Sequence, residues 1–511
     1  MPLRSATRFA GTARPSLCLS LTEPTLGACL DQARAHRHLV DLVELRVDLL
    51  HQGQWAGVAR FATECPLPAM CTIRRPRDGG RWIAPEAVRR RLLTAAARAP
   101  FRYLDLESDL PTGAVPLPPR GPRIIRSLHD TAGTPPHLPA LLRALPRSGR
   151  EIPKLAVTPH GCADLARIVA AAQAAPRPHI VLGMGPYGVA TRLLAAKLGS
   201  LLTFTSAGRR AAAPGHLDPH TMQRRYRFGA IGAATPVFGL IGNPVAHSRS
   251  PEIHNRGMAV AGVPAVYVPF LVDDVDRFLD LAPSLGVRGL SVTIPHKETV
   301  MALLHRADPS VSGAGACNTV VLEQGRWTGF NTDAAGFMEP LAGLLARGGI
   351  RRATVIGAGG AARAIVWALR EAGVDVLIAN RTLPRAQVLA AEMSADAVAL
   401  TASDLAQHVS DYSDLIVQAT SLGMERHGEG AHAPVRDPIA HVPLNGREIV
   451  YDIVYAPPET PLLARARAAG CTIVFGHEML LGQAYEQFRL FTGVPYPSVE
   501  RRRLSRLLGP D

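Results

Sequence analysis

The chain has 511 residues, of which 56 are lysine or arginine and 42 are aspartate or glutamate, giving a formal net charge of +14. This length exceeds what one hydrophobic core supports and predicts about two to four domains. The basic residues are spread through the chain without a basic-aromatic module, so we expect no nucleic-acid partner. No apolar run approaches the ~18 residues of a membrane span, so we expect no membrane partner either.

The seven cysteines are scattered and include no C-x-x-C pair. This spacing indicates buried thiols in a reducing compartment rather than a disulfide framework, and it predicts no metal site. We therefore expect a cytoplasmic protein. Residues 1–16 are rich in arginine and serine and contain no acid, as in a transit peptide. The stretch is short, however, and we predict a disordered tail at residues 1–14.

From residue 15 to residue 228, short β-like runs alternate with amphipathic helical segments. The expected strands are 17–24, 42–50, 68–76, 103–110, 124–130, 152–159, 179–185 and 201–207. Helical segments between them include 85–99, 162–175 and 188–199. Strands that alternate with helices at this spacing predict a parallel sheet, and eight such units predict a closed (β/α)₈ barrel.

Polar side chains gather in or at the ends of these strands, where such a barrel carries its chemistry. They are Glu44, Arg46, Asp48, Arg74, Glu107, His129 and Lys154. Charged groups inside a barrel need partners or a ligand, because burying an isolated ion is costly. Each residue alone would be interpreted as a satisfied polar core residue, but all of them at one mouth indicate a site.

Lysine is rare in this chain, where only Lys154, Lys197 and Lys297 occur. Apolar strand neighbours disfavour the ammonium form of Lys154, so its amine becomes nucleophilic near neutral pH. Such an amine forms a Schiff base with a ketone, which arginine cannot do because its guanidinium stays protonated. His129, one strand earlier, is placed to transfer the proton. These residues predict proton abstraction beside an iminium, followed by loss of water.

The motifs ELRVD, TIRRPRDGG, SLHDTAGTP, EIPKLAV and APGH occur in this order. They resemble the successive motifs of type I 3-dehydroquinate dehydratases over residues 15–220. The resemblance implies that Lys154 is the Schiff-base lysine and His129 the general acid and base. It also implies that Glu44, Arg46, Arg74 and Arg192 bind substrate or orient the histidine.

Two positions depart from the pattern of these dehydratases. The acid before the double glycine is usually Glu in the family, and here it is Asp78. The family's lid loop reads S-A-P-G-Q, whereas this chain has Ala212 at its beginning and His216 at its end. Ala212 cannot form a hydrogen bond, whereas His216 can donate one and, if protonated, can pair with the substrate carboxylate. We expect this loop to bind substrate more weakly than the family's.

After a Gly/Ala-rich linker at residues 229–235, the chain restarts with PVFGLIGNPVAHSRSPEIHN, GLSVTIPHKET, GAGACNTVV and GFNTDAAG. Lys297 follows a predicted strand, and Asp333 lies in a polar turn between apolar segments. A lysine and an aspartate together suit proton transfer to a carbonyl oxygen during reduction. A surface salt bridge is the alternative interpretation, which the rarity of lysine weakens.

A β-run at residues 353–356 leads into Gly357, Gly359 and Ala362, then into a helix and a second β-run. This strand, glycine turn and helix is typical of a dinucleotide site, in which the pyrophosphate lies at the helix N-terminus. An NAD site usually has Asp or Glu after the second strand to bind the ribose 2′-hydroxyl. Here Arg381 and Arg385 follow it, and both suit a 2′-phosphate. We therefore predict NADP as cofactor.

With QATSLGM, VYDIVYAPPETPLL and GHEMLLGQAYEQF, these motifs resemble shikimate dehydrogenases over residues 236–495. The resemblance implies that Lys297 and Asp333 are the catalytic pair. It implies substrate contacts by Ser248, Ser250, Thr293, Asn318 and Gln483. It implies an NADP site of Gly357, Gly359, Gly360, Ala361, Asn380, Arg381, Thr382, Arg385 and Thr420. Ser291 stands where many relatives have Asn, which leaves the choice between shikimate and quinate open.

Together the resemblances imply an α/β chain like the bifunctional dehydratase–dehydrogenase known from plants. The (β/α)₈ barrel would occupy residues 15–228, and an α/β substrate domain would follow at 236–340, completed by helices at 478–505. A Rossmann-like NADP-binding domain would occupy 341–477. The substrates would be 3-dehydroquinate and then 3-dehydroshikimate or shikimate, all of them small molecules.

Two alternatives stay open. The second half could be a quinate dehydrogenase that serves quinate breakdown, or the chain could be a non-catalytic, quinate-responsive regulator. A regulator is free to lose its chemistry, yet Lys154, His129, Lys297 and Asp333 are all retained. Their retention favours an enzyme. The sequence makes no prediction of oligomeric state.

Overall fold

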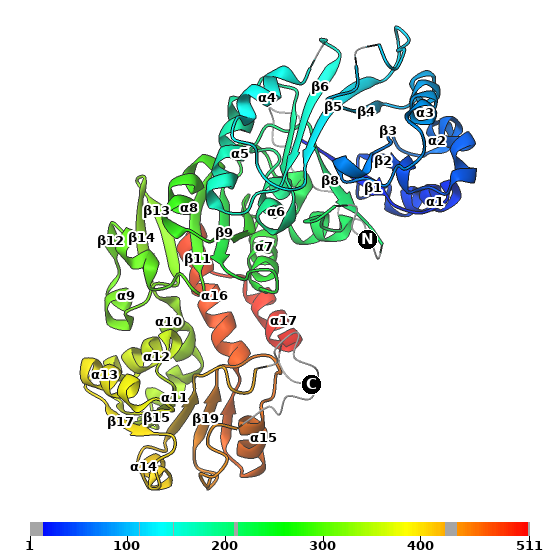
Figure 1. Cartoon of the computed structure of the whole chain (residues 1–511). Coiled ribbons are helices and arrows are strands. Elements are labelled where there is room, and N and C mark those ends of the chain that lie inside the picture. Colours follow the sequence, from blue (N-terminus) through cyan, green and yellow to red (C-terminus); the bar gives the residue numbers. More distant parts are fainter. Residues whose placement is uncertain (1–13, 112, 147, 209–212, 425–436, 509–511) are drawn as a thin grey trace. The chain divides into compact units, whose positions relative to one another are not determined.

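The computed structural model describes residues 14–508, apart from 112, 147, 209–212 and 425–436 (Figure 1). The chain divides into two compact units. The first comprises Met1–Pro251 and Pro264–Val287, and the second Glu252–Val263 and Arg288–Asp511. The predicted tail lies almost wholly outside the described residues. None of the helices in the described part of the chain is long and apolar enough to cross a membrane.

The first unit contains eight parallel strands in the order β7-β6-β5-β4-β3-β2-β1-β8. Their bounds are β1 (Ser16–Leu21), β2 (Leu42–Arg46), β3 (Ala69–Thr72), β4 (Tyr103–Glu107), β5 (Arg123–Asp130), β6 (Glu151–Val157), β7 (Ile180–Gly183) and β8 (Leu202–Ser206). Each lies within or overlaps a strand predicted from the sequence. The predicted barrel is therefore confirmed, in a nearly closed form.

Closure between β7 and β8 relies on side chains. One backbone bridge joins His179 to Ser200 just before the two strands. The hydroxyl of Ser200 accepts from the N–H of Val181 and lies 3.0 Å from the Val181 carbonyl, to which it donates. The N–H of Gly183 donates to the hydroxyl of Thr191 at 2.8 Å. These hydroxyls satisfy buried backbone groups of β7 that a neighbouring strand would otherwise satisfy.

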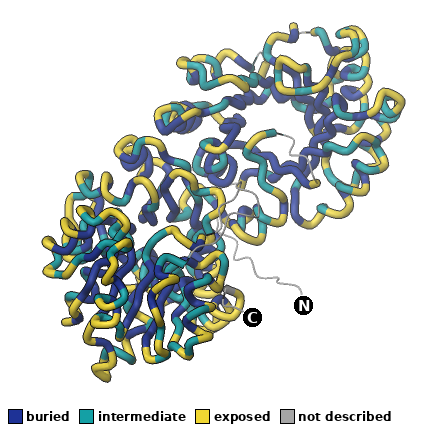
Figure 2. The backbone as a smooth tube through the Cα atoms, turned by 60° about the horizontal axis from the view of Figure 1, so that its bottom comes forward, coloured by how far each residue is buried: buried dark blue, intermediate teal, exposed yellow. Residues whose placement is uncertain are grey.

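Helices surround the barrel strands. They are α1 (Leu26–His36), α2 (Val58–Glu64), α3 (Glu86–Arg98), α4 (Leu138–Ala144), α5 (Cys162–Ala174) and α6 (Gly185–Leu193). The segment between β4 and β5 is rich in proline, which lacks the N–H that a helix needs, and its described residues form no helix. In Figure 2 the buried residues follow the inner strands, and the exposed residues lie on outer turns and helix faces.

The rest of the first unit packs against the outside of the barrel. Strand β9 (Val237–Gly242) pairs in parallel with β10 (Val266–Leu271), and α8 (Val275–Leu281) follows. Asp273 accepts a hydrogen bond from the N–H of Cys162 at the start of α5, 2.8 Å away. The amine of Lys197 donates to the carbonyl of Ala233 at 2.8 Å. Lys197 therefore holds the segment that leads out of the barrel.

The second unit begins with strands of a mixed sheet. Strand β11 (Val287–Val292) pairs antiparallel with β13 (Thr319–Glu323), which pairs antiparallel with β14 (Arg326–Phe330). The short β12 (Arg306–Ala307) runs parallel to β14. Helix α10 (Thr332–Met338) follows β14 directly, so the end of that strand presents the first turn of a helix.

A six-stranded sheet follows in the order β17-β16-β15-β18-β19-β20, with every pair parallel. Its strands are β15 (Arg352–Ile356), β16 (Asp375–Asn380), β17 (Asp396–Ala399), β18 (Leu415–Gln418), β19 (Ile449–Asp452) and β20 (Thr472–Val474). Its helices are α12 (Gly360–Glu371), α13 (Leu383–Met393), α14 (Leu405–Asp411) and α15 (Pro461–Ala468). The strand order reverses between β15 and β18, the place where such sheets bind dinucleotides.

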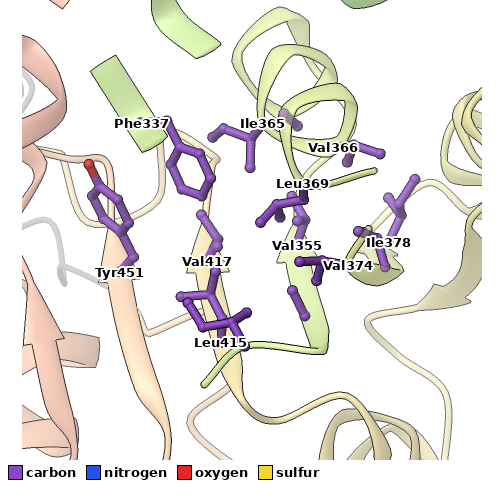
Figure 3. Packing of buried hydrophobic residues seen from close by; sticks show 14 of the residues in the cluster. Phe337, Val355, Ile365, Val366, Leu369, Val374, Ile378, Leu415, Val417 and Tyr451 are labelled. Carbon is purple, nitrogen blue, oxygen red and sulfur yellow. The ribbon is translucent and has the colours of Figure 1, made fainter. Parts of the chain in front are cut away.

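The core of this sheet is dry and aliphatic. Ile365, Val366 and Leu369 of α12 pack among strand residues such as Val355 and Ile378 (Figure 3). Every one of these five side chains is fully buried. The amphipathic α12 thus fixes the glycine turn that precedes it onto the end of β15.

Helix α10 crosses α16 (Gly476–Thr492) at two glycines. A Cβ atom on Gly336 would lie 2.4 Å from the backbone nitrogen of Gln483. A Cβ atom on Gly482 would lie 2.9 Å from the Cα of Gly336. Only glycine allows backbones to approach this closely, and the crossing places α10 directly against the predicted substrate-binding helix.

Gly336→Ala should therefore force α10 and α16 apart and destabilise the second unit by about 1–3 kcal/mol, as overpacking does. Denaturant unfolding measures the loss. The matched control is Gly343→Ala in α11 (Ala342–Leu345), where a Cβ atom meets nothing within 4 Å. That change should be neutral or stabilise by about 0.5–1 kcal/mol. Equal stability of the two variants would contradict the tight crossing.

Candidate active sites

The barrel encloses a cavity of about 120 Å³. Its lining includes Ser20, Glu44, Arg46, Arg74, Asp78, His129, Lys154, Arg192, Phe204, Ala213 and His216. The cavity thus brings together the residues that the resemblance to the dehydratases implies, together with His216; they are Glu44, Arg46, Arg74, His129, Lys154 and Arg192. Ala212 lies outside the described residues.

Lys154 extends from β6 into this cavity, with its side chain 3% exposed. Its Nζ lies 2.8 Å from Oδ2 of Asp105 and 4.3 Å from the centroid of the Phe204 ring. Burial lowers the pKa of Lys154, although the Asp105 carboxylate beside it acts in the opposite direction. The fraction of unprotonated amine at neutral pH is therefore larger than for a lysine in water.

Asp105 on β4 is a site residue that the sequence reasoning missed. Its Oδ1 accepts from the hydroxyl of Ser127 at 2.6 Å, and Nη2 of Arg74 lies 3.0 Å from its Oδ2. Burial alone would raise the pKa of Asp105, but Lys154 and Arg74 hold it well below its usual range. The available signal was an acid between Leu104 and Leu106 in a barrel strand, where alternation directs every second side chain inward.

His129 lies on β5, and its ring lines the cavity. Neither ring nitrogen has a hydrogen-bond partner within the described part of the chain. Burial, together with the charges of Arg74 and Lys154, holds the pKa of His129 well below its usual value. The imidazole is therefore neutral and free to accept a proton.

Two of the predicted polar residues serve structure instead of the cavity. Asp48 forms a two-bond pair with Arg46, with Nε–Oδ1 and Nη2–Oδ2 distances of 2.9 and 2.8 Å. Glu107 pairs with the fully buried Arg89 at 2.9 Å. The expectation that all the polar strand residues form one site is therefore wrong for Asp48 and Glu107, which are absent from the cavity lining.

Glu44 and Asp78 line the cavity with their carboxylates already bound. Glu44 accepts from the hydroxyls of Ser20 at 2.6 Å and Thr72 at 2.8 Å. Asp78 accepts from Nε of Arg75 at 2.7 Å. The shorter Asp side chain is thus held by a neighbouring arginine, and among the described residues no carboxylate forms a hydrogen bond with His129.

Arg192 and His216 also line the cavity. Arg192 is buried on α6, and its Nε and Nη1 have no hydrogen-bond partner among the described residues. Burial lowers the pKa of Arg192 to about 9. An uncompensated guanidinium in a cavity suits a carboxylate ligand.

The sequence allows a protonated His216 that pairs with the substrate carboxylate, whereas the structure favours the neutral imidazole. Burial, and then the charge of Arg192, hold the pKa of His216 well below its usual value. A protonated His216 near pH 6 is therefore not expected in the free protein. The physical reason is that a second cation beside a buried arginine is strongly disfavoured. His216 remains a neutral hydrogen-bonding group.

The second unit places Lys297, Asn318 and Asp333 together. Nζ of Lys297 lies 2.5 Å from Oδ2 of Asp333, and Nδ2 of Asn318 donates to its Oδ1 at 2.8 Å. Asp333 lies in the first turn of α10, whose N-cap Asn331 accepts from the Asp333 N–H. A carboxylate at a helix N-terminus is favoured by the helix dipole. Asp333, itself held by Asn318 and by the start of α10, thus holds the ammonium group of Lys297 in one position.

The other predicted substrate contacts lie on three segments. Thr293 follows β11, and Gln483 lies half-buried on α16. Ser248 and Ser250 belong to the first unit, where the N–H of Ser250 donates to the hydroxyl of Ser248 at the start of α7 (Ser250–Ala261). Their contacts with substrate stay predictions.

The glycine turn after β15 fits a dinucleotide. Gly357 has a φ of +120°, and a Cβ atom there would lie 3.0 Å from Cγ2 of Thr420. A Cβ atom on Gly359 or Gly360 would meet nothing within 4 Å, so that side of the turn is open. Helix α12 begins there without a side-chain cap, and its first N–H groups are the natural partners of a pyrophosphate.

The loop after β16 fits a second phosphate. Arg381 and Arg385 are exposed, and neither forms an ion pair with any described residue. The side chain of Asn380 donates to the carbonyl of Thr382 and holds the loop at the strand end. Two cationic side chains without acidic partners, after the second strand, suit a 2′-phosphate group.

Both halves of the chain match known protein families. The sequence matches the family Type I 3-dehydroquinase over residues 17–232. It also matches Shikimate dehydrogenase substrate binding domain (240–320), Shikimate / quinate 5-dehydrogenase (346–427) and Shikimate 5′-dehydrogenase C-terminal domain (476–498). The bifunctional 3-dehydroquinate dehydratase/shikimate dehydrogenase, chloroplastic, of Arabidopsis thaliana is 34% identical over 491 residues, covering 92% of this chain and 80% of that protein.

The chain belongs to the bifunctional 3-dehydroquinate dehydratase/shikimate dehydrogenase family. The resemblance predicted from the motifs is therefore confirmed for both halves. The shikimate dehydrogenase (NADP(+)) of Natronomonas pharaonis is 44% identical over 264 residues, covering 51% of this chain and 95% of that protein. A solved structure of dehydroquinate dehydratase and shikimate dehydrogenase from S. pombe aligns over 97% of this chain and 98% of its own, with 23% identity and a TM-score of 0.45.

In this bifunctional family member, Asp105→Asn should move the titration of Lys154 to lower pH. The carboxylate raises the pKa of the amine, whereas burial and Arg74 lower it, so its removal leaves these two effects opposed only by the weaker effect of Glu44. The chain contains only three lysines, so ¹³Cε labelling of lysine gives an NMR titration of each one.

The signals of Lys197 and Lys297 serve as internal references in the same sample. Asp31→Asn on the exposed face of α1 is the matched control, because it removes a carboxylate outside the cavity. An unchanged Lys154 titration in Asp105→Asn would contradict the proposed electrostatic control of the amine.

Proposed function

We propose that this chain dehydrates 3-dehydroquinate to 3-dehydroshikimate in the barrel and reduces that product to shikimate with NADPH in the second unit. The observation that carries the proposal is a buried lysine amine, Lys154, in one cavity with a neutral imidazole, His129. The Lys297–Asp333 pair supports the second reaction. The product of the first reaction is the substrate of the second, so one chain carries two consecutive steps.

In the barrel, the unprotonated Nζ of Lys154 attacks the substrate ketone, and loss of water gives an iminium. The iminium acidifies the neighbouring carbon, and His129 accepts the proton from that carbon. The resulting imidazolium gives the proton to the departing hydroxyl, which leaves as water. Hydrolysis of the imine then releases 3-dehydroshikimate and restores Lys154.

The remaining residues of the cavity bind and orient the substrate. Arg192 holds the carboxylate, because two of its guanidinium nitrogens lack a partner among the described residues. Glu44, Arg46 and Arg74 bind hydroxyl groups or orient His129. His216, a neutral imidazole in the loop after β8, donates a hydrogen bond to the substrate.

In the second unit, Lys297 gives a proton to the carbonyl oxygen as it becomes a hydroxyl, and Asp333 holds the ammonium in position. Ring hydroxyls and the carboxylate are bound by Thr293, Asn318, Gln483, Ser248 and Ser250. The group that supplies the hydride is NADPH, which suits the turn and the arginines described above. Its site comprises Gly357, Gly359, Gly360, Ala361, Asn380, Arg381, Thr382, Arg385 and Thr420.

We assign residues 15–228 to the dehydratase barrel and 229–235 to a linker. The substrate-binding domain of the dehydrogenase would span 236–340, completed by helices at 478–505, and the NADP-binding domain would span 341–477. A cytoplasmic location stays our prediction. The substrates of both sites are small molecules.

Incubation of the purified chain with 3-dehydroquinate and NADPH tests the proposal. The ultraviolet absorbance of the conjugated enone should rise as the barrel works, and NADPH absorbance should fall as the second unit works. Without NADPH only the enone should accumulate. Parallel oxidation assays with shikimate and quinate separate a shikimate dehydrogenase from a quinate dehydrogenase. Absence of both signals would favour a non-catalytic regulator.

Lys154→Arg should abolish dehydration and leave reduction of 3-dehydroshikimate within about twofold, because only an amine forms the imine. Lys297→Ala should do the reverse and slow reduction by about 10²–10⁴-fold, the usual worth of a general acid. Borohydride added during turnover should attach substrate to Lys154. Label on Lys197, or dehydration retained in the arginine variant, would overturn the assignment.

Arg381→Gln with Arg385→Gln should weaken NADPH binding by about 100-fold and NADH binding by about twofold at most, since only NADPH carries the 2′-phosphate. The KM values for the two cofactors at saturating 3-dehydroshikimate measure the difference. The double change Arg351→Gln, Arg352→Gln is the matched control, since these exposed arginines stand at the opposite end of β15. Parallel losses for both cofactors would show that the arginines act on folding.

A further inference from the structure

A continuous line of buried polar side chains leads from β11 to the Lys297–Asp333 pair. Its members are Ser291, Gln487, Thr319, Asn318 and Asp333. Each is 5% exposed or less. The residues come from two strands, β11 and β13, and two helices, α10 and α16, with Asn318 just before β13, so no local motif requires them all to meet.

The order of donors and acceptors along this line is fixed by its ends. The backbone N–H of Thr332 can only donate, and it lies 2.8 Å from Oδ1 of Asn318. The amide of Asn318 therefore presents Nδ2 to Asp333, at 2.8 Å from Oδ1. Lys297 can also only donate, so both carboxylate oxygens of Asp333 accept. The arrangement suits an ionised Asp333.

Thr319 is the central member of the line. Its hydroxyl accepts from Nε2 of Gln487 at 3.0 Å and donates to Oδ1 of Asn318 at 2.8 Å. Oε1 of Gln487 in turn accepts from the hydroxyl of Ser291 at 2.8 Å. Successive hydrogen bonds polarise one another in a low-dielectric interior, so each donor strengthens the next.

Asn318 receives more donors than an amide oxygen usually accepts. Besides Thr319 and the Thr332 N–H, the Thr332 hydroxyl lies 3.1 Å from the same Oδ1. This concentration of donors draws electron density toward Oδ1 and makes the Nδ2–H group a stronger donor to Asp333. It also leaves the amide a single orientation.

We propose that Ser291, Thr319 and Gln487 are positioning residues for the reduction, acting through Asn318 on the Lys297–Asp333 pair. The inference rests on the proposed dehydrogenase function of the second unit. It gives Ser291 a defined task, since its hydroxyl orients Gln487 from the strand that precedes Lys297. Substrate contact by these three residues is not part of the proposal.

Thr319→Val tests it, because valine keeps the shape of threonine and removes the hydroxyl. We expect kcat for 3-dehydroshikimate reduction to fall about tenfold, with KM for NADPH and the rate of dehydration unchanged. With NADPH deuterated at the transferred position, the isotope effect on kcat should rise, because a less well-held pair slows the chemical step. Thr319→Ser should restore kcat to within about twofold of the wild type.

The matched control is Thr328→Val on β14, a buried threonine whose hydroxyl donates to Glu323 outside this line. It should leave kcat and the isotope effect unchanged. Ser291→Ala is the second variant, and its effect should be smaller than that of Thr319→Val. Combined with Thr319→Val it should add nothing, because the line is already broken.

Three outcomes would overturn the inference. In the first, Thr319→Val has the same kcat and isotope effect as Thr328→Val. In the second, Thr319→Val lowers kcat but leaves the isotope effect unchanged, as a loss of folded enzyme would. The effects of Ser291→Ala and Thr319→Val could also add in full, which marks two independent structural roles. A wild-type chain that does not reduce 3-dehydroshikimate would overturn the proposed function itself, and the inference with it.

Discussion

The contact between Lys154 and Asp105 governs the barrel, because it allows an ionisable amine to lie inside a protein interior. Burying an isolated ammonium ion is costly, and a carboxylate at 2.8 Å repays part of that cost. Asp105 in turn requires Arg74 and Ser127 for its own oxygens. One buried carboxylate thus joins several parts of the cavity, since its partners come from β5 (Ser127), from β6 (Lys154) and from the segment after β3 (Arg74).

A lysine–aspartate pair also forms the second site, but its setting gives it different chemistry. The side chain of Lys154 is 3% exposed, whereas that of Lys297 is 24% exposed. Desolvation disfavours the ammonium of Lys154 and leaves an amine that can attack carbon. Lys297 reaches water and is held by Asp333 at the start of a helix, which suits an ammonium that gives up a proton and regains it. In the proposed mechanism, therefore, the difference in burial makes Lys154 the nucleophile and Lys297 the acid, although each lysine is paired with an aspartate.

The sequence predicted the barrel strands, the glycine turn, Lys154 in the barrel cavity and Lys297 beside Asp333, because these depend on local alternation and on short motifs. It missed Asp105, which lies 49 residues before Lys154 and meets it only through the pairing of β4, β5 and β6. The line from Ser291 to Asp333 was missed for the same reason, as Gln487 follows Ser291 by 196 residues. Glu107 was wrongly placed in the site because strand position alone does not show that a helix supplies it with a buried arginine. Charge at His216 was also misjudged, since an isolated histidine carries no sign of the cations that surround it in the fold.

The rarity of lysine has a physical explanation at each of its three positions. Lys154 needs an amine that can lose its proton, and Lys297 needs a compact cation beside one carboxylate oxygen. Lys197 has neither task, and its amine lies close to the backbone of Gly286. A Cβ atom on Gly286, which has a φ of +73°, would lie 2.6 Å from the Lys197 amine, so this glycine leaves just enough space for the lysine head. The amine donates to the carbonyl of Ala233, in the segment that connects the barrel to β9. In a chain that otherwise uses arginine for positive charge, each of the three lysines thus makes a defined contact through its amine, with Asp105, Ala233 or Asp333.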